Sequence, residues 1–423
     1  MPDTSADSFD VIVVGAGPGG SSTAAYLGRL GRKVLLLDKA SFPRDKTCGD
    51  ALSGKSMRVI RELGLVAEVE KLPHGSITGV TFSSPNSTQV SIPFQSSDPN
   101  REGGTGYCIR RYNTDNLFFT AAKKTPNVTT MEKFQVNEVV MENGMAVGVK
   151  GIALTDPARA ERIYRAKVVV GSDGVNSAVA RAVLGEKAQL DPSHSCDAVR
   201  AYYSGVKGMN GQIEIHFVKS VMPGYFWIFP LDNGTANVGL GLLSGDLAKK
   251  MKKDKTNLIS MMNNIIQNEP MFKERFADSK PLGPITGWRL PFGSKRRQLA
   301  GDGWVLVGDA ASLVDPFSGE GVGNATNSGR IAAQFIDEAI ERNDVSRLSL
   351  ARYEVAVWDE FGKELSTSYK MQQLGRHSWL LNLVVGKAAT KPKVRELISA
   401  SLSNEEAKKK FENPLTYLWL LLT

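Results

Sequence analysis

Three glycines near the start of the chain have the spacing that holds a dinucleotide. They are Gly15, Gly17 and Gly20, in the run Gly15-Ala16-Gly17-Pro18-Gly19-Gly20. In the pattern G-x-G-x-x-G, the first glycine permits a tight turn and the second lets backbone amides approach a pyrophosphate. The third lets the following helix lie close to the strand. Downstream, Asp38 stands where a carboxylate can accept hydrogen bonds from ribose hydroxyls.

The surrounding residues predict the elements that such a site needs. A β-branched run, Asp10 to Val14, predicts a buried parallel strand, and a helix is expected from Ser21 to Leu30. A second apolar strand, Lys33 to Leu37, leads into Asp38. The N-terminus of the helix would add partial positive charge toward a phosphate. This order predicts dinucleotide binding over a ligand-free βαβ unit, but does not separate FAD from NAD.

Two later stretches have a similar form, an apolar strand that runs into a turn with glycine and aspartate. The first is Lys167 to Ser177, with Asp173 and Gly174. The second is Gly303 to Ala311, with Gly308 and Asp309. A loop with several glycines and a long amphipathic helix, ending at about Glu341, follow the second stretch.

The three stretches together resemble the flavoprotein family of para-hydroxybenzoate hydroxylase, with its G-x-G-x-x-G, D-G and G-D motifs. The resemblance covers roughly residues 8–385 and implies non-covalent FAD as the cofactor. It implies that Asp309 holds a ribityl hydroxyl of FAD and that residues 316–323 meet the flavin ring. Asp173 matches the D-G aspartate. Arg111 and Asp115 resemble the R-x-x-x-D element, whose arginine commonly lies near flavin; a surface salt bridge is the alternative.

Three signatures resemble the geranylgeranyl reductase branch of that family. The first is the glutamate form Pro316-Phe317-Ser318-Gly319-Glu320-Gly321, where hydroxylases usually carry glutamine. The second is Pro43-Arg44-Asp45-Lys46-Thr47-Cys48-Gly49-Asp50, and the third is Pro223-Gly224-Tyr225-Phe226-Trp227-Ile228-Phe229-Pro230. The W-x-W-x-I-P signature of flavin halogenases is not seen.

The motifs and the resemblance together give one set of expected cofactor-binding residues. The set is Gly15, Gly17, Pro18, Gly20, Asp38, Lys39, Arg44, Cys48, Gly49, Arg111, Asp173, Gly174, Gly308, Asp309, Pro316, Gly319, Glu320, Gly321 and Val322.

Cys48, Tyr225 and Trp227 are the expected catalytic residues. Tyr225, Trp227 and Phe229 alternate along a strand, so they share one face and predict an apolar wall; plain core packing is the alternative. An apolar tunnel suits a polyprenyl chain better than a small polar acid. Protonation of an isolated alkene, with hydride delivered to the more substituted carbon, develops positive charge that aromatic faces stabilise. Cys48 is the candidate proton donor or relay, and a buried inert cysteine is the alternative.

The resulting hypothesis is an FAD-dependent enzyme that reduces C=C bonds of a geranylgeranyl-type chain. Monooxygenation of an apolar substrate is the second hypothesis, and product mass separates the two. Electron transfer to a quinone pool is a third, but Cys48, Cys108 and Cys196 lack the spacing and number for an iron–sulfur cluster. His194 and His216 are expected to be satisfied structural or surface residues, and no metal site is expected.

The expected fold is mixed α/β. A Rossmann-like FAD-binding domain would comprise residues 1–75, 105–190 and 290–345. An inserted antiparallel-sheet substrate domain would comprise residues 76–104 and 191–289, and residues 346–423 would form a helical end piece. The inserted sheet would contain the strands Val199–Val206, Gln212–Phe217, Tyr225–Pro230 and Thr235–Leu242.

Composition and charge limit the partners. The 423 residues carry a net charge of +8, which indicates either a solvated basic surface or attraction to an anionic substrate or membrane surface. No aromatic-interleaved basic stripe suggests nucleic acid. The expected substrate is a prenyl lipid or prenyl diphosphate, with NAD(P)H or a ferredoxin-like protein as electron donor. Sparse cysteines and a polar start without a signal peptide predict a cytoplasmic location. The apolar tail, Leu415 to Leu422, either packs as a helix or anchors at a membrane interface.

Overall fold

The computed structural model describes residues 8–94, 106–402, 410–413 and 416, and these form a mixed α/β protein. Its strands are β1 Ser8–Val14, β2 Val34–Leu37, β3 Ala51–Leu52, β4 Gly75–Ile77, β5 Gly79–Ser83, β6 Gln89–Pro93, β7 Gly106–Cys108, β8 Val128–Met131, β9 Phe134–Glu142, β10 Met145–Ala153, β11 Glu161–Gly171, β12 Ser195–Ser204, β13 Gln212–His216, β14 Tyr225–Pro230, β15 Thr235–Leu243, β16 Lys280–Pro281, β17 Thr286–Pro291, β18 Ala300–Gly301 and β19 Trp304–Leu306. Its α-helices are α1 Pro18–Arg29, α2 Gly54–Glu62, α3 Val66–Lys71, α4 Arg111–Lys124, α5 Ala178–Leu184, α6 Ser244–Asp254, α7 Leu258–Asn268, α8 Pro270–Phe276, α9 Val322–Glu341, α10 Arg347–Leu374, α11 Ser378–Thr390 and α12 Pro392–Ser401.

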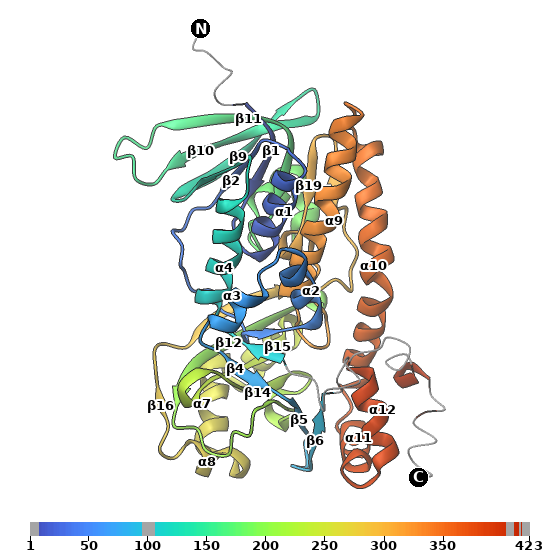
Figure 1. Ribbon diagram of the computed structural model, residues 1–423. Coiled ribbons are helices and arrows are strands. Elements are labelled where there is room, and N and C mark those ends of the chain that lie inside the picture. The colour runs from blue at the N-terminus through green and yellow to red at the C-terminus, as the bar shows by residue number, and fades with distance from the viewer. Residues whose placement is uncertain (1–7, 95–105, 403–409, 414–415, 417–423) are drawn as a thin grey trace.

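The first sheet gathers the strands that precede the three glycine-rich stretches. Its order is β18-β19-β11-β1-β2-β8, and the pairs from β19 to β8 are parallel. Parallel neighbours end at the same edge of a sheet, so the loops after β1, β2, β11 and β19 meet there. The helices α1 and α9 pack against each other beside this sheet (Figure 1).

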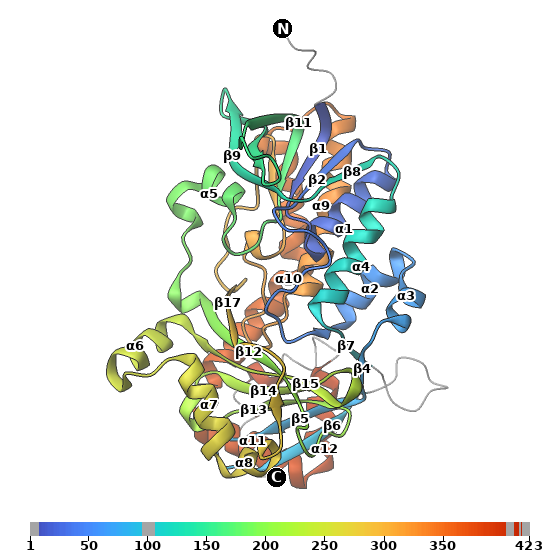
Figure 2. The same cartoon turned by 90° about the vertical axis from the view of Figure 1, so that its left-hand side faces the viewer.

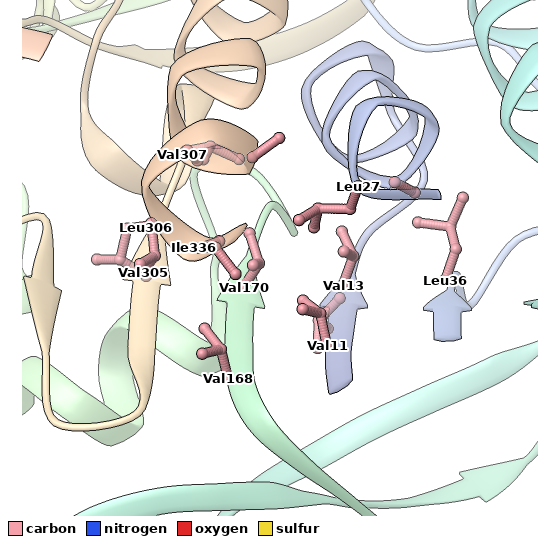
Figure 3. Close-up of a cluster of buried hydrophobic side chains, with 14 of the residues drawn as sticks. Val11, Val13, Leu27, Leu36, Val168, Val170, Val305, Leu306, Val307 and Ile336 are labelled. Carbon is pink, nitrogen blue, oxygen red and sulfur yellow. The ribbon is translucent and has the colours of Figure 1, made fainter. Parts of the chain in front are cut away.

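The core of this sheet is formed by short β-branched runs. Figure 3 shows Val13 of β1, Val170 of β11 and Val305 of β19 on neighbouring strands, with Leu27 of α1 and Ile336 of α9 above them. All five side chains are fully buried. Strands covered on both faces need near-continuous apolar sequence, which explains why these runs could be recognised as parallel strands.

Two boundaries differ from the sequence-based expectation. The first helix begins at Pro18 and not at Ser21, because proline fits the first helical position, where its missing N–H is not needed. Gly19 and Gly20 therefore lie inside the helix. The strand expected from Lys167 begins at Glu161, because its first half pairs antiparallel with β10 while its second half runs parallel to β1.

The second sheet lies at the other end of the molecule (Figures 1 and 2). Its order is β16-β12-β15-β14-β13-β5-β6, with β17 also paired to β12. The four strands expected between residues 199 and 242 are β12 to β15, and the pairs among them are antiparallel as expected. Figure 2 shows α7 and α8 beside this sheet, and α7 contacts β15 and β12. A third, small sheet has the order β3-β7-β4, and Figure 1 shows its strand β4 between the two larger sheets.

The helix α10 runs from the first sheet toward α11 and α12 beside the second (Figure 1). These helices fall within the range expected to be helical, and α11 packs on β6. We propose the domain division given above, with these two sheets as the centres of the two domains.

Among the described residues, no helix is long and apolar enough to cross a membrane. The apolar tail lies outside the described residues, except for Thr416.

The approach of α1 to β1 gives a test of the fold. A Cβ atom at Gly20 would lie 1.8 Å from the carbonyl oxygen of Gly15, which is backbone and cannot move aside. Gly20→Ala should therefore lower the free energy of unfolding by about 3 kcal/mol and weaken FAD retention.

Gly386→Ala is the matched control, because Gly386 lies inside α11 and its Cβ position has open space. That variant should gain about 0.5–1 kcal/mol from helix propensity. Both are measured by urea denaturation and by flavin absorbance after desalting. Equal stability of the two variants would contradict the steric explanation.

Candidate functional site

The three glycine-rich stretches converge at the carboxyl edge of the first sheet. Gly15 has a positive φ of +97°, and a Cβ atom there would lie 2.4 Å from the carbonyl oxygen of Ser172. A Cβ at Gly308 would lie 2.9 Å from the Cβ of Ala325 in α9. These close approaches require glycine and bring residues 15–20, 172–174 and 308–325 into one cluster.

Asp38 connects the loops after β1 and β2. Its Oδ2 accepts a hydrogen bond of 2.8 Å from the backbone N–H of Ala16, and its Oδ1 accepts one of 2.8 Å from that of Ala40. The side chain is buried. The carboxylate keeps further lone pairs, so it fits the ribose-binding role.

The N-terminus of α1 offers backbone donors to an anion. Gly17 is the residue that precedes the helix, and no side chain caps it. A Cβ at Gly17 would lie 3.6 Å from Nη2 of Arg44, so the guanidinium stands over the glycine turn. The other terminal nitrogen of Arg44, Nη1, is 2.8 Å from Asp115 Oδ2. A pyrophosphate fits a helix N-terminus flanked by an arginine.

Lys46 is a residue of this site that the expected set omitted. Its Nζ is 3.2 Å from Asp309 Oδ2 and would be 4.0 Å from a Cβ atom at Gly174. It therefore lies between the second and third stretches. The signal was present in the R-x-K-x-C-G segment, but no local pattern shows that this lysine reaches a residue so distant in sequence.

Asp173 has a local structural task. Its Oδ1 accepts from Ser177 Oγ at 2.5 Å and its Oδ2 accepts from the N–H of Ala178 at 2.6 Å, which satisfies the first turn of α5. Burial raises the pKa of this carboxyl. Its carboxylate is thus occupied by the helix, and its contribution to the site is the shape of the turn at Gly174, whose φ is +79°.

The loop before α9 is tied to the segment after Cys48. Glu320 Oε1 accepts from Ser53 Oγ at 2.8 Å and from the N–H of Gly323 at 2.7 Å, so this side chain also caps the helix. Burial raises its pKa. The other expected residues lie along the same loop: Pro316 accepts from Gln372 Nε2 at 2.6 Å, Gly319 has a φ of +74°, Gly321 approaches Asp309, and Val322 begins α9.

Arg111 lies beside Cys48 in a buried charge cluster. Its Nε and Nη2 are 2.5 and 2.9 Å from the two carboxylate oxygens of Asp115, which also holds Arg44. The alternative of a surface salt bridge is wrong, because Arg111 is 5% exposed and Asp115 is fully buried. The paired charge of Asp115 outweighs burial and raises the pKa of Arg111, so it remains cationic beside the thiol.

The Cys48 thiol is held in its protonated form by its surroundings. Burial is the largest cause that raises its pKa; the charge of Asp50 acts in the same direction, and that of Arg111 opposes it. The sulfur accepts a hydrogen bond of 3.4 Å from the backbone N–H of Asp50. A neutral thiol is a group that an apolar site can hold without a large desolvation cost.

Asp50 is the main residue that sequence reasoning missed. It is 1% exposed, and its carboxylate accepts from Asn237 Nδ2 at 2.8 Å, Tyr202 OH at 2.9 Å and the N–H of Arg111 at 3.1 Å. Burial raises its pKa to about 6, against the hydrogen bonds of Asn237 and Tyr202 and the charge of Arg200. Only its place two residues after Cys48 could have drawn attention to it.

The aromatic residues of β14 lie against this segment. Trp227 Nε1 donates to Asn237 Oδ1 at 2.9 Å, and Asn237 Nδ2 donates to the carbonyl of Cys48 at 2.6 Å. A Cβ at Gly49 would lie 3.0 Å from the ring of Phe229. The Tyr225 and Trp227 rings are 6.0 Å apart, and Tyr225 OH donates to the carbonyl of Ser318 at 2.6 Å. The wall is therefore shared between core packing and the site.

Three expected or considered residues lie elsewhere. Lys39 is exposed. His216 is satisfied by Ser83 and Glu214, and His194 by Ser294, as expected for structural histidines. Within the described ranges, no cluster of three His, Cys, Asp or Glu side chains has the arrangement of a metal site.

Comparisons with known proteins agree with this geometry. Residues 8–334 match the family described as FAD binding domain. The chain is 31% identical over 372 residues to the digeranylgeranylglycerophospholipid reductase of Methanocella arvoryzae, which covers 86% of this chain and 87% of that protein. It is 30% identical over 379 residues to the menaquinone reductase of Mycobacterium tuberculosis, covering 87% and 84%. A geranylgeranyl bacteriochlorophyll reductase-like protein of Thermoplasma acidophilum has a similar structure, with a TM-score of 0.81, 24% identity and coverage of 96% and 99%.

The buried carboxyl of Asp50 gives a pH-dependent test of the site. In the folded protein its pKa is about 6, above the ordinary value of 3.8, so the folded state keeps a proton that the unfolded chain releases between these values. The contribution of Asp50 to the free energy of unfolding therefore falls as pH rises through that window. Asp50→Asn lacks this loss, and its stability relative to the native protein should rise by about 2–3 kcal/mol between pH 4 and pH 7.

The measurement is urea denaturation of both proteins at the two pH values. Asp278→Asn is the control, because Asp278 is exposed and Lys207 lowers its pKa. That variant should show no such rise. A pH-independent difference for Asp50→Asn would contradict the raised pKa.

Proposed function

This chain belongs to the FAD-binding-domain family, and we propose that it reduces C=C bonds of a polyprenyl chain. It is an FAD-dependent oxidoreductase; the substrate is the part we propose. The observation that supports the proposal most directly is the half-buried Cys48, whose raised pKa keeps its thiol protonated, next to the contact of Gly49 with the aromatic wall of β14. An enzyme that acts on an isolated alkene needs a proton donor in an apolar site.

The names of the relatives favour recognition of the prenyl chain of the substrate over recognition of its head group. One relative is named for a digeranylgeranylglycerophospholipid and another for menaquinone. These molecules share a polyprenyl chain and differ in their polar ends. An apolar wall with few polar groups can recognise the shared part.

The residues that would hold FAD are those of the converging loops. The turn at Gly15 to Gly20 and Arg44 fit the pyrophosphate, Asp38 fits a ribose, and Asp309 with Lys46 fits the ribityl chain. The residues 316–323 fit the flavin ring. When reduced, bound FAD supplies a hydride.

We propose that Tyr225 and Trp227 stabilise positive charge on the substrate. The polar atoms of both rings are already used, Tyr225 OH by Ser318 and Trp227 Nε1 by Asn237. Tyr225 is half-buried and Trp227 is 7% exposed, so the ring of Tyr225 is the more accessible of the two. Aromatic ring faces attract cations through their quadrupole. Cys48 would give its proton to the less substituted alkene carbon while charge develops at the more substituted one.

Reducing equivalents and lipid access would come from outside the chain. We propose NAD(P)H or a ferredoxin-like protein as the donor, and peripheral contact with a membrane that carries the substrate. The helix α6 supports the contact, because Met251 is 46% exposed next to Lys250, Lys252 and Lys253. An apolar residue among lysines is typical of a helix that lies on an anionic surface.

Removal of the thiol tests the proposed chemistry. Cys48→Ala should slow reduction of a geranylgeranyl substrate by about 100-fold or more, because general acid catalysis contributes that much. Turnover is measured with dithionite-reduced enzyme, and the mass of the product is determined by mass spectrometry. A gain of two hydrogens per double bond supports reduction, whereas a gain of oxygen in an aerobic assay with NAD(P)H would indicate a monooxygenase.

Cys196→Ala is the matched control, because Cys196 in β12 is half-buried as Cys48 is. It should keep native turnover, and both variants should keep bound flavin. Unchanged turnover in Cys48→Ala would remove this thiol from the mechanism.

Vesicle binding tests the membrane contact. Replacing Lys250, Lys252 and Lys253 by glutamine should weaken binding to vesicles that contain anionic lipid by about 1 kcal/mol per lysine. Flotation with anionic and zwitterionic vesicles is the measurement. Equal flotation of native protein and variant would contradict a role for α6.

A further inference from the structure

A pocket that Tyr202 helps to line opens to solvent. It has a volume of about 430 Å³, and its lining includes Arg110, Arg200 and Tyr202 together with Asp45 and Asp232. We call it the arginine pocket. Arg200 Nη2 is 2.5 Å from Asp45 Oδ2, and Arg110 Nε is 3.6 Å from Asp232 Oδ1. The cations in its wall are thus balanced by carboxylates, and the pocket can hold water without a strong preference for an anion.

Tyr202 forms the wall between the arginine pocket and Asp50. The guanidinium carbons of Arg110 and Arg200 are 4.7 and 4.2 Å from the centre of its ring, so the ring is held in place by stacking. Its hydroxyl donates to Asp50 Oδ2 at 2.9 Å. A hydroxyl can pass a proton because it both donates and accepts.

Asp50 contacts Cys48 through its backbone N–H, and the charge of its carboxylate acts on the thiol. Its φ is +70°, a conformation in which the N–H donates to Cys48 Sγ at 3.4 Å while the carboxylate meets Tyr202 and Asn237. Asn237 Nδ2 also donates to the carbonyl of Cys48, so one amide fixes both ends of this short turn. Such a strained backbone persists only where surrounding contacts impose it.

We propose that Asp50 is the acid–base partner that returns a proton to Cys48, and that Tyr202 carries protons to Asp50 from water in the arginine pocket. This inference rests on the proposed reduction of an alkene and assigns the proton supply of that reaction. Asp50 and Tyr202 are positioning residues, because they act on the substrate only through Cys48.

The protons balance for each double bond that is reduced. The new C–H bond at the less substituted carbon takes the proton of the Cys48 S–H bond, which leaves a thiolate. The carboxylic acid of Asp50 gives its proton to that thiolate, and a proton from pocket water, passed through the Tyr202 hydroxyl, restores the acid. The second hydrogen arrives as hydride from the reduced cofactor, whose electrons come from NAD(P)H or a ferredoxin-like donor.

The charged and titratable groups around Asp50 allow this cycle. Arg200 and Tyr202 face it from β12, Arg111 from α4 and Cys108 from β7, while Asp45 faces Arg200 and Tyr202. Burial raises the pKa values of Asp50 and Cys48, so each holds its proton at a higher pH than in water. The pKa of Asp50, about 6, is still below that of the thiol, so transfer from the acid to a thiolate is downhill.

The first experiment needs no prenyl substrate. The alkylation rate of Cys48 by iodoacetamide is followed against pH in the FAD-loaded protein, with the Cys48 peptide identified by mass spectrometry. Asp50→Asn removes a negative charge beside the thiol, so the midpoint should move to lower pH by about 1 unit at an unchanged plateau rate. Asp278→Asn should leave the midpoint in place. A midpoint that does not move in Asp50→Asn overturns the coupling.

The second experiment follows the proton during turnover. Native turnover should fall as pH rises through about 6, because less Asp50 then carries its proton, and Asp50→Asn should lose this limb and turn over more slowly. Tyr202→Phe should lower kcat about tenfold with little change in KM, and enlarge the solvent isotope effect. Tyr203→Phe is the matched control, because Tyr203 packs against Phe276 in the core of the second sheet.

The outcomes separate this inference from the proposed function. A shifted Cys48 midpoint with no prenyl reduction in any protein supports the coupling and contradicts the proposed substrate. Normal prenyl reduction with native pH profiles in Asp50→Asn and Tyr202→Phe supports the proposed function and overturns the proton route.

Discussion

The close approach of backbone to backbone at the carboxyl edge of the first sheet is the constraint on which the site depends. A Cβ atom at Gly20 would meet the carbonyl of Gly15, and one at Gly15 would meet that of Ser172. Interiors are too closely packed to absorb such overlaps. Because these positions are glycine, α1 can begin beside β1 and leave its N-terminal amides facing outward. The proposed FAD site is centred on this turn.

Buried and half-buried charges then connect parts of the chain that are distant in sequence. Asp115 holds Arg111 and Arg44, Lys46 reaches Asp309, and Lys55 reaches Asn324 and Glu364. Buried ion pairs add little net stability, because desolvation cancels much of the attraction. Their effect here is positional: they hold residues 44–55 against α4 and α9, so the segment that carries Cys48 has one conformation.

The site combines an apolar wall and a small polar cluster around a single cysteine. Trp227 and Phe229 belong to the apolar cluster of the second sheet, while Asp50, Asn237 and Tyr202 form the polar one. Asn237 is bonded to both. In such a low-dielectric setting a fully satisfied polar network is rigid, and a carboxyl within it keeps a raised pKa. The proposed reduction of an alkene needs both properties, an apolar surface for the substrate and a proton that is not lost to solvent.

The amino-acid sequence by itself determined the local features. The glycine spacing, the apolar runs of β1, β11 and β19, and the alternation of Tyr225, Trp227 and Phe229 are periodic or short-range patterns, which reflect backbone geometry within a few residues. Only the tertiary structure decided which side chains meet. Asp50, Tyr202 and Asn237 come from three distant segments. Apart from the position of Asp50 two residues after Cys48, nothing in their own neighbourhoods distinguishes them from ordinary polar residues. Asp50 has its unusual pKa because folding removes water from it, and burial is a property of the whole packed chain that no local pattern carries.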